Sequence, residues 1–166
     1  MKRFLVCLSL VIFCAAATAA EAAKTIKLGV VTKPGSAQNI VADKFKELLE
    51  QRSNGELEVK IFHSGSLGNE TEILQQIQIG AVELGVITSG PFDSFDPIVR
   101  VIDYPFLFKD HQQADQILDG PLGAEILTSL EGSGFKGLCF SENGFRNLTN
   151  SRKAVSRPED IEGLKI

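Results

Sequence analysis

Side chains that form covalent cross-links or bind transition metals are scarce in this sequence. It contains three cysteines, two histidines and no tryptophan among 166 residues. Cys7 and Cys14 lie in the apolar N-terminal segment, so Cys139 is the single cysteine of the remaining chain. One cysteine excludes an intramolecular disulfide and a cysteine-rich metal site. Because Cys139 lies within an apolar run, we predict a buried, unreactive thiol.

Catalytic motifs are equally scarce. His63 and His111 have no companion at the spacing of zinc ligands, and no Gly-x-Ser-x-Gly motif marks a nucleophile. Residues 132–137 (GSGFKG) match the letters of the dinucleotide-binding fingerprint, but that motif needs a strand before it and a helix after it. We expect the reverse order here. The sequence therefore predicts no cofactor and no metal, although an enzyme that uses carboxylates assembled in space stays open.

Long apolar runs are absent except at the N-terminus. Lys2 and Arg3 precede an apolar segment at residues 5–13, and small residues follow as far as residue 23. This is the pattern of a secretory signal peptide, and the apolar segment is too short to span a bilayer. We expect residues 1–22 to be a signal peptide cleaved near Ala22, and the mature protein to be periplasmic in a bacterium.

Positive charge is in the minority. The formal net charge of −4 would become −5 if Lys2, Arg3 and Glu21 were removed with the signal peptide. This excess of negative charge argues against a nucleic-acid partner. The remaining length, about 144 residues, is enough for one core of ordinary domain size.

Strand and helix patterns alternate along the rest of the chain. Strands are expected at residues 25–31, 57–61, 82–88 and 135–141, and helices from Ser36 to Gly55, from Asn69 to Gly80, and over 110–118 and 122–130. Ser36 and Asn69 are typical helix N-caps, and Gly55 and Gly80 are typical helix ends. The alternation predicts an α/β domain with a largely parallel sheet.

Two apolar groups are expected to be buried. The first helix should bury one face, made of Ile40, Val41, Phe45, Leu48 and Leu49. The irregular stretch at residues 92–109 contains Phe106, Leu107 and Phe108, which we expect to pack inward.

Candidate binding residues occur at a strand end and in a polar stretch near the C-terminus. Thr88 and Ser89 end the third strand, and ligands of open α/β sheets bind at the carboxyl ends of strands. Arg146 lies between Phe145 and Asn147, and its planar guanidinium can bind a carboxylate through two hydrogen bonds. A solvated arginine on a turn is the alternative interpretation. With a signal peptide and no catalytic set, the pattern favours capture of a ligand over its conversion.

The chain resembles the solute-binding proteins of tripartite ATP-independent periplasmic (TRAP) transporters, the DctP-like family 7 extracellular solute-binding proteins. The matching phrases lie in order at residues 27–35, 45–59, 65–70, 80–89, 105–108, 143–151 and 158–166. The resemblance implies a periplasmic-binding-protein-like (type II) fold, in which two α/β lobes close over an organic acid. It also implies a monomer that delivers this small carboxylate to the permease subunits of a TRAP transporter in the membrane.

The same resemblance implies a division of the chain. Residues 23–142 would form the first α/β lobe, and residues 143–166 the hinge crossing and the start of an incomplete second lobe. The chain would then be the N-terminal half of a receptor.

The resemblance also implies a set of ligand-binding residues. Arg146 would contact the ligand carboxylate, and family members place a second arginine directly after the phrase at residues 163–166. The other contacts would come from Val31, Thr32, Glu70, Thr88, Ser89, Asn143 and Phe145. The alternative for Thr88 and Ser89 is simple strand termination, and for Glu70 a charge favoured at a helix N-terminus.

Two other interpretations of the chain's function remain open. One is a ligand-sensing interaction domain of the same fold. The other is a truncated remnant that binds little ligand and exposes apolar surface.

Overall fold

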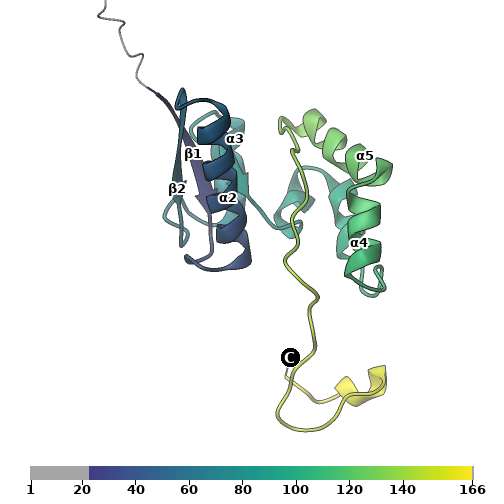
Figure 1. Ribbon diagram of the computed structural model, residues 1–166. Helices are drawn as coiled ribbons and strands as arrows, with labels where there is room; N and C mark the ends of the chain where they lie inside the picture. The colour runs from purple at the N-terminus through teal and green to yellow at the C-terminus, as the bar shows by residue number, and fades with distance from the viewer. Residues whose placement is uncertain (1–22, 166) are drawn as a thin grey trace, which may run out of the picture.

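A parallel three-stranded sheet organises the N-terminal part of the molecule. The computed structural model describes residues 23–165, so the predicted signal peptide lies outside the described residues. The strands are β1 (Lys24–Val30), β2 (Leu57–Phe62) and β3 (Leu84–Val86), in the order β2-β1-β3, with both pairs parallel. Helix α2 (Ala37–Arg52) connects β1 to β2, and α3 (Glu70–Gln78) connects β2 to β3 (Figure 1). The predicted α/β fold with a parallel sheet is confirmed.

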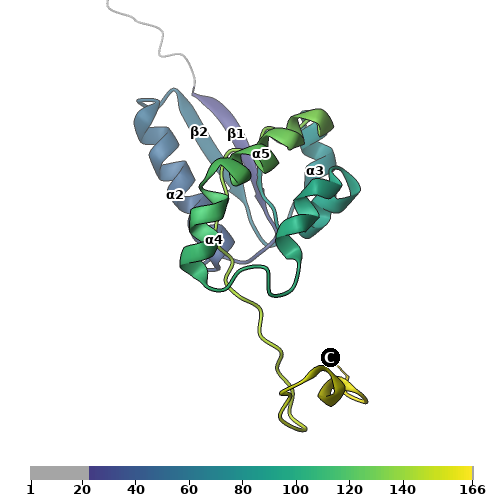
Figure 2. The same ribbon diagram turned by 90° about the vertical axis from the view of Figure 1, so that its right-hand side faces the viewer.

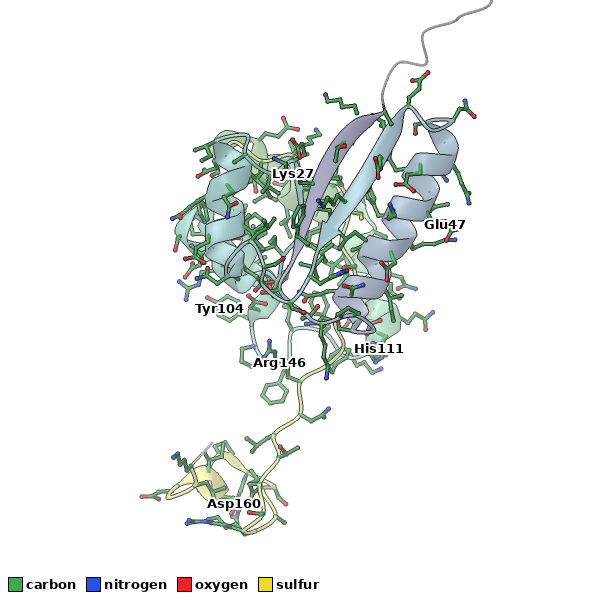
Figure 3. The ribbon with its side chains drawn as sticks, turned by 90° about the vertical axis from the view of Figure 1, so that its left-hand side faces the viewer. Lys27, Glu47, Tyr104, His111, Arg146 and Asp160 are labelled. Carbon is green, nitrogen blue, oxygen red and sulfur yellow. The ribbon has the colours of Figure 1, made fainter. Side chains whose placement is uncertain are left out.

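The second half of the described chain is helical and then extended. Its elements are the 3-10 helices η1 (Gly90–Ser94) and η2 (Pro97–Asp103), the helices α4 (His111–Leu118) and α5 (Pro121–Ser129), and the 3-10 helices η3 (Leu130–Ser133) and η4 (Pro158–Ile161). Helices α4 and α5 lie next to each other, and the C-terminal segment leaves the lobe (Figures 1 and 2). Asp160 of η4 therefore lies far from Lys27 of the sheet (Figure 3).

Local capping explains where α2 and α3 begin. Ser36 Oγ accepts a hydrogen bond from the backbone N–H of Asn39 at 3.3 Å. Asn69 and Glu72 form a reciprocal capping box: the Asn69 side chain accepts from Glu72 N–H at 3.0 Å, and Glu72 accepts from Asn69 N–H at 2.7 Å. Gly55 has a φ of 82°, a left-handed conformation that suits glycine after a helix end. The predicted helix boundaries follow from these contacts.

Two apolar clusters fill the interior. One joins the sheet to α2 through Leu28, Val30, Ala42 and Val59. The other joins α3 to the later helices through Leu74, Val99, Ile126, Leu130 and Phe135. The Phe135 ring meets Phe92 and Phe95 edge to face, with centroids 5.6 and 5.3 Å apart. The second cluster packs together residues that are far apart in the sequence.

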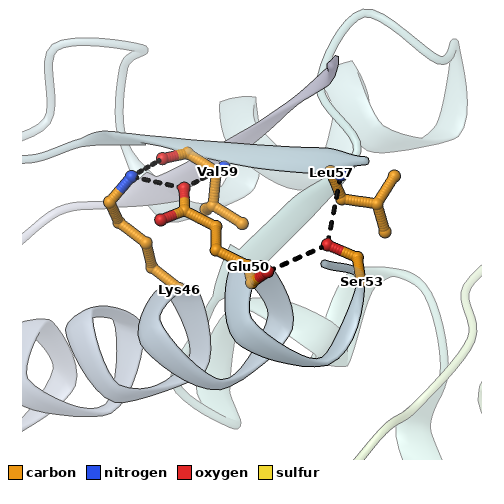
Figure 4. A network of polar contacts seen from close by, with 5 residues as sticks. All are labelled: Lys46, Glu50, Ser53, Leu57 and Val59. Carbon is orange, nitrogen blue, oxygen red and sulfur yellow. Dashed lines mark hydrogen bonds and ion pairs between the residues drawn. The ribbon is translucent and has the colours of Figure 1, made fainter. Parts of the chain in front are cut away.

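A polar network fastens the C-terminal half of α2 to β2 (Figure 4). Lys46 Nζ donates to Glu50 Oε1 at 2.6 Å and to the Val59 carbonyl at 2.7 Å, and Val59 N–H donates to the same Glu50 oxygen at 2.8 Å. Ser53 Oγ donates to the Glu50 carbonyl and accepts from Leu57 N–H, each at 3.2 Å. The hydrogen bonds that join α2 to β2 stabilise the packing of the helix on the strand.

The predicted strand at 135–141 is wrong, as is the prediction of a buried Cys139. Phe135 is buried, but the residues after it have no regular structure, and Cys139 is exposed. A strand needs a neighbour for its backbone hydrogen bonds, and none of the strands described within residues 23–165 pairs with this segment.

Part of the predicted buried face is also wrong. Ile40 is 59% exposed, whereas Gln38, Asn39 and Ala42 are the buried residues of α2. Residues 38, 39 and 42 share a helix face, and residue 40 lies about 200° around the helix from residue 38. The first turn of α2 thus directs polar side chains inward. Phe106 and Leu107 are likewise exposed, at 101% and 44%.

Candidate functional site

Strands β1 and β3 end side by side at one edge of the sheet. Strand β1 runs into Val31 and Thr32, and β3 is followed closely by Thr88 and Ser89. All four residues are half-buried. Since adjacent parallel strands share a carboxyl edge, the structure brings these two predicted pairs to the same edge, where open α/β sheets bind ligands.

Thr32 is tied to the start of α2. The Ser36 hydroxyl donates to Thr32 Oγ1 at 2.6 Å, and the same oxygen of Ser36 caps the helix. The N-terminus of α2 is therefore held against the end of β1. The backbone N–H groups and the positive end of the helix dipole lie at this edge.

Glu70 connects three elements at this edge. It is the first residue of α3, and its Oε1 accepts from the Thr88 backbone N–H at 2.7 Å and from Gln38 Nε2 at 3.3 Å. Its Oε2 accepts from the Thr88 hydroxyl at 2.6 Å. One carboxylate thus links α2, α3 and the segment after β3, and both of its oxygens already accept hydrogen bonds.

A second polar chain, centred on the buried Asn39, runs from α2 to the end of β2. Asn39 is 1% exposed, and its Nδ2 donates to Asp43 Oδ2 at 2.8 Å. Its Oδ1 lies 3.0 Å from Nδ1 of His63. Because Oδ1 can only accept, the proton of this contact is on His63 Nδ1. The end of β2 is thereby joined to the same helix turn.

Ser89 makes a contact outside this cluster. Its hydroxyl donates to Asp103 Oδ1 at 2.5 Å, which ties the start of η1 to the end of η2. The hydroxyl proton of Ser89 is used in that bond, so only the lone pairs of its oxygen remain for another donor.

Arg146 lies in the extended segment that leaves the lobe. Asn143, Phe145 and Arg146 are exposed and have no regular secondary structure. The Phe145 ring packs edge to face on His111, with centroids 4.8 Å apart, and His111 Nδ1 contacts the Glu142 carboxylate. Arg146 lies beyond the carboxyl ends of β1 and β2, at the level of the lobe where His111 and Tyr104 lie (Figure 3).

The structure assembles only part of the predicted set. Glu70 and Thr88 are bonded, and Val31, Thr32 and Ser89 lie at the same strand ends. Within residues 23–165, no hydrogen bond or ion pair joins Arg146 to this group.

Sequence reasoning missed Gln38, Asn39 and His63. Gln38 and Asn39 are the second and third residues of α2, directly after the cap, and His63 follows β2. A polar pair in the first turn of a helix that starts at a sheet edge is the signal that could have identified Gln38 and Asn39. Its meaning depended on which face of α2 met the sheet.

No helix among residues 23–165 is both long and apolar enough to cross a membrane. In the same range, no three His, Cys, Asp or Glu side chains are grouped to hold a metal ion.

Comparison with known proteins identifies the family of this chain. The model of the bacterial extracellular solute-binding proteins, family 7 (DctP), matches residues 28–166. The chain belongs to this family.

Three members of the comparison illustrate the similarity. The 2,3-diketo-L-gulonate-binding periplasmic protein YiaO of Escherichia coli is 39% identical over 149 residues, which are 90% of this chain and 45% of YiaO. A TRAP periplasmic solute-binding protein of Ochrobactrum anthropi has a TM-score of 0.81 and 39% identity, covering 86% of this chain and 45% of that protein. The sugar acid-binding protein DctPAm of Advenella mimigardefordensis, solved with galactonate, has a TM-score of 0.79 and 36% identity, covering 86% and 46%.

The chain therefore spans a little under half the length of the relatives that it matches. Its described lobe has the type II periplasmic-binding-protein fold of these TRAP proteins.

Proposed function

We propose that this protein is a periplasmic receptor that captures a small organic acid for a TRAP transporter. The observation that carries the proposal is family membership together with the ligand of a structural neighbour: DctPAm holds galactonate, and YiaO is named for another sugar acid. The polar carboxyl edge of the sheet supports it, because that edge is where such folds bind ligands.

Arg146 is the proposed anchor for the ligand carboxylate. Its guanidinium is permanently charged and forms two parallel hydrogen bonds with a carboxylate. Arg146 is exposed and lies beyond the carboxyl ends of β1 and β2, the end of the sheet at which the ligand would bind (Figure 3). Enclosure of the pair would remove water and strengthen the attraction.

The remaining predicted residues would surround the ligand. Thr32, Thr88 and Ser89 offer hydroxyl oxygens or backbone groups, and Val31 offers an apolar contact. Glu70 would act mainly by holding Thr88 in place, since both of its oxygens already accept hydrogen bonds. Asn143 and Phe145 would contact the ligand from the side of Arg146.

The family consists of transport proteins, and we propose that this member binds its acid without converting it. Its proposed partners are the small carboxylate and the membrane permease subunits, with no nucleic acid. We further propose export with signal-peptide cleavage near Ala22, a monomeric state, a first lobe at residues 23–142, and a hinge crossing with the start of a second lobe at residues 143–166.

The test is calorimetry on the ligand-free full-length protein with a panel of organic acids that includes D-galactonate. At least one acid should bind, and Arg146→Ala should weaken its binding by about 2–5 kcal/mol, the range for truncating one partner of a buried charge pair. Arg152→Ala removes a charge from the same segment and serves as the matched control. Unchanged affinity in Arg146→Ala would remove this residue from the site, and turnover of any acid would favour the enzyme alternative.

A further inference from the structure

Gln38 carries a buried hydrogen-bond acceptor without a donor. The residue is 7% exposed, and its Oε1 has no hydrogen-bond partner within the described chain. Buried polar side-chain atoms are nearly always paired, so an unpaired one needs an explanation.

The orientation of the Gln38 amide follows from its neighbour. Its Nε2 donates to Glu70 Oε1 at 3.3 Å. A carboxylate can only accept, so turning the amide over would place two acceptors against each other. The free atom is therefore the oxygen, and it requires a hydrogen-bond donor.

The position of this oxygen relates it to the proposed ligand site. Gln38 is the second residue of α2 and is bonded to Glu70, which is bonded in turn to Thr88 at the end of β3. A ligand carboxylate placed here would bring no donor and would be repelled by Glu70. A hydroxyl would donate to the Gln38 oxygen without burying a charge. An ammonium group would also donate, but it would lose far more hydration on entering this buried position.

We propose that Gln38 Oε1 accepts a hydrogen bond from a hydroxyl group of the bound acid, and that this contact selects polyhydroxylated acids over plain mono- and dicarboxylates. The inference rests on the proposed function and names its substrate class. Arg146 would bind the carboxylate end of such a ligand, and Gln38 would accept a hydrogen bond from a hydroxyl at its other end. Since the oxygen is covered in this structure, the contact forms only as side chains at the sheet edge move during binding.

The experiment compares four six-carbon probes by calorimetry on the ligand-free full-length protein: D-galactonate, hexanoate, adipate and 6-aminohexanoate. These differ in their hydroxyl groups, in a second carboxylate or in an ammonium group. We expect galactonate to bind at least about 100-fold more tightly than each of the others, because a site built for a hydrogen bond rejects an analogue that lacks it.

Variants then assign the preference to Gln38. Gln38→Met should weaken galactonate binding about tenfold, the value of one neutral hydrogen bond, and change hexanoate binding by less than about twofold. Gln38→Asn keeps an amide but moves it away from the ligand, so it should weaken galactonate binding in the same way. It replaces the Met variant if that variant does not fold. Gln75→Met, the same substitution at an exposed position of α3, is the matched control and should change neither.

The outcomes separate the two proposals. Acid binding without a preference for galactonate, or a preference that Gln38→Met and Gln38→Asn leave intact, overturns the role of Gln38 and leaves the receptor function standing. Equal binding of 6-aminohexanoate assigns the oxygen to an ammonium donor and also overturns the proposal. Equal losses for galactonate and hexanoate would mean that Gln38 supports the structure of the site and does not contact a ligand hydroxyl, which also overturns the proposal. No binding by the folded wild type to any acid, including those of the wider panel, contradicts the receptor function and this inference together.

Discussion

Glu70 holds Thr88 through both oxygens of its carboxylate. Oε1 accepts from the Thr88 backbone N–H at 2.7 Å, and Oε2 accepts from the Thr88 hydroxyl at 2.6 Å. The two residues are 18 positions apart, at the start of α3 and just after β3. The pair therefore fixes the carboxyl edge of the sheet.

The first prediction concerns this pair. Thr88→Val removes the hydroxyl donor with little change of shape, so it should lower the free energy of unfolding by about 1–2 kcal/mol, since the bond is to a charged acceptor and partly exposed. Thr128→Val is the control, because the Thr128 hydroxyl bonds only to a carbonyl of its own helix, that of Ala124. Urea unfolding measures both. Equal losses in the two variants would show that the Glu70 contact adds nothing specific.

The second prediction concerns pH. The hydrogen bond from Lys46 and that from the Val59 backbone N–H lower the pKa of Glu50 below its ordinary value of 4.5, with a small opposing effect of burial. A group whose pKa is lowered by folding stabilises the protein above its unfolded pKa and loses that contribution as the pH falls through the folded pKa. Acidification below about pH 4.5 should therefore cost wild type more stability than Glu50→Gln.

Urea unfolding of both proteins at neutral pH and at about pH 3 tests this difference. Glu47→Gln removes a carboxylate from the same helix and controls for the change in net charge. A Glu50→Gln variant as acid-sensitive as wild type would be evidence against the contribution of the Lys46 and Val59 contacts.

The third prediction concerns a close approach inside the lobe. A Cβ at Gly29 would lie 3.0 Å from Cγ2 and 3.1 Å from Cδ1 of Ile73, which is fully buried. Gly29→Ala should therefore destabilise the protein by about 1–3 kcal/mol, as overpacking does. Adding Ile73→Val removes Cδ1 and should make the double variant more stable than the sum of the two single changes implies. Strict additivity would show that the two side chains do not meet.

The fourth prediction concerns exposed apolar surface. Phe106 is fully exposed with a φ of 62°, and Tyr104 and Leu107 beside it are exposed too. A polypeptide of residues 23–166 should bind a hydrophobic dye and self-associate. Phe106→Asn should reduce both without lowering the melting temperature, because asparagine tolerates a positive φ better than phenylalanine. Leu57→Asn, at a half-buried strand position, is the contrasting variant and should lower the melting temperature.

Local signals were enough to predict most of the elements. Ser36 and Asn69 cap helices because their side chains bond to backbone N–H groups of the next turn, a contact that depends only on nearby residues. Residues 57–61 alternate in polarity, as a half-buried strand requires. The predicted strand at 135–141 failed because a strand also depends on a distant partner.

The sequence by itself determined the α/β class, the helix starts and ends, and the family, because each rests on short-range patterns or on residues in a fixed order. Only the tertiary structure decided that Gln38 and Asn39 face inward while Ile40 faces out, and that Glu70 meets Thr88. Such contacts depend on how each helix is rotated against the sheet and on which strand ends become neighbours. Residues far apart in the chain settle both by packing together, and no local stretch contains that information.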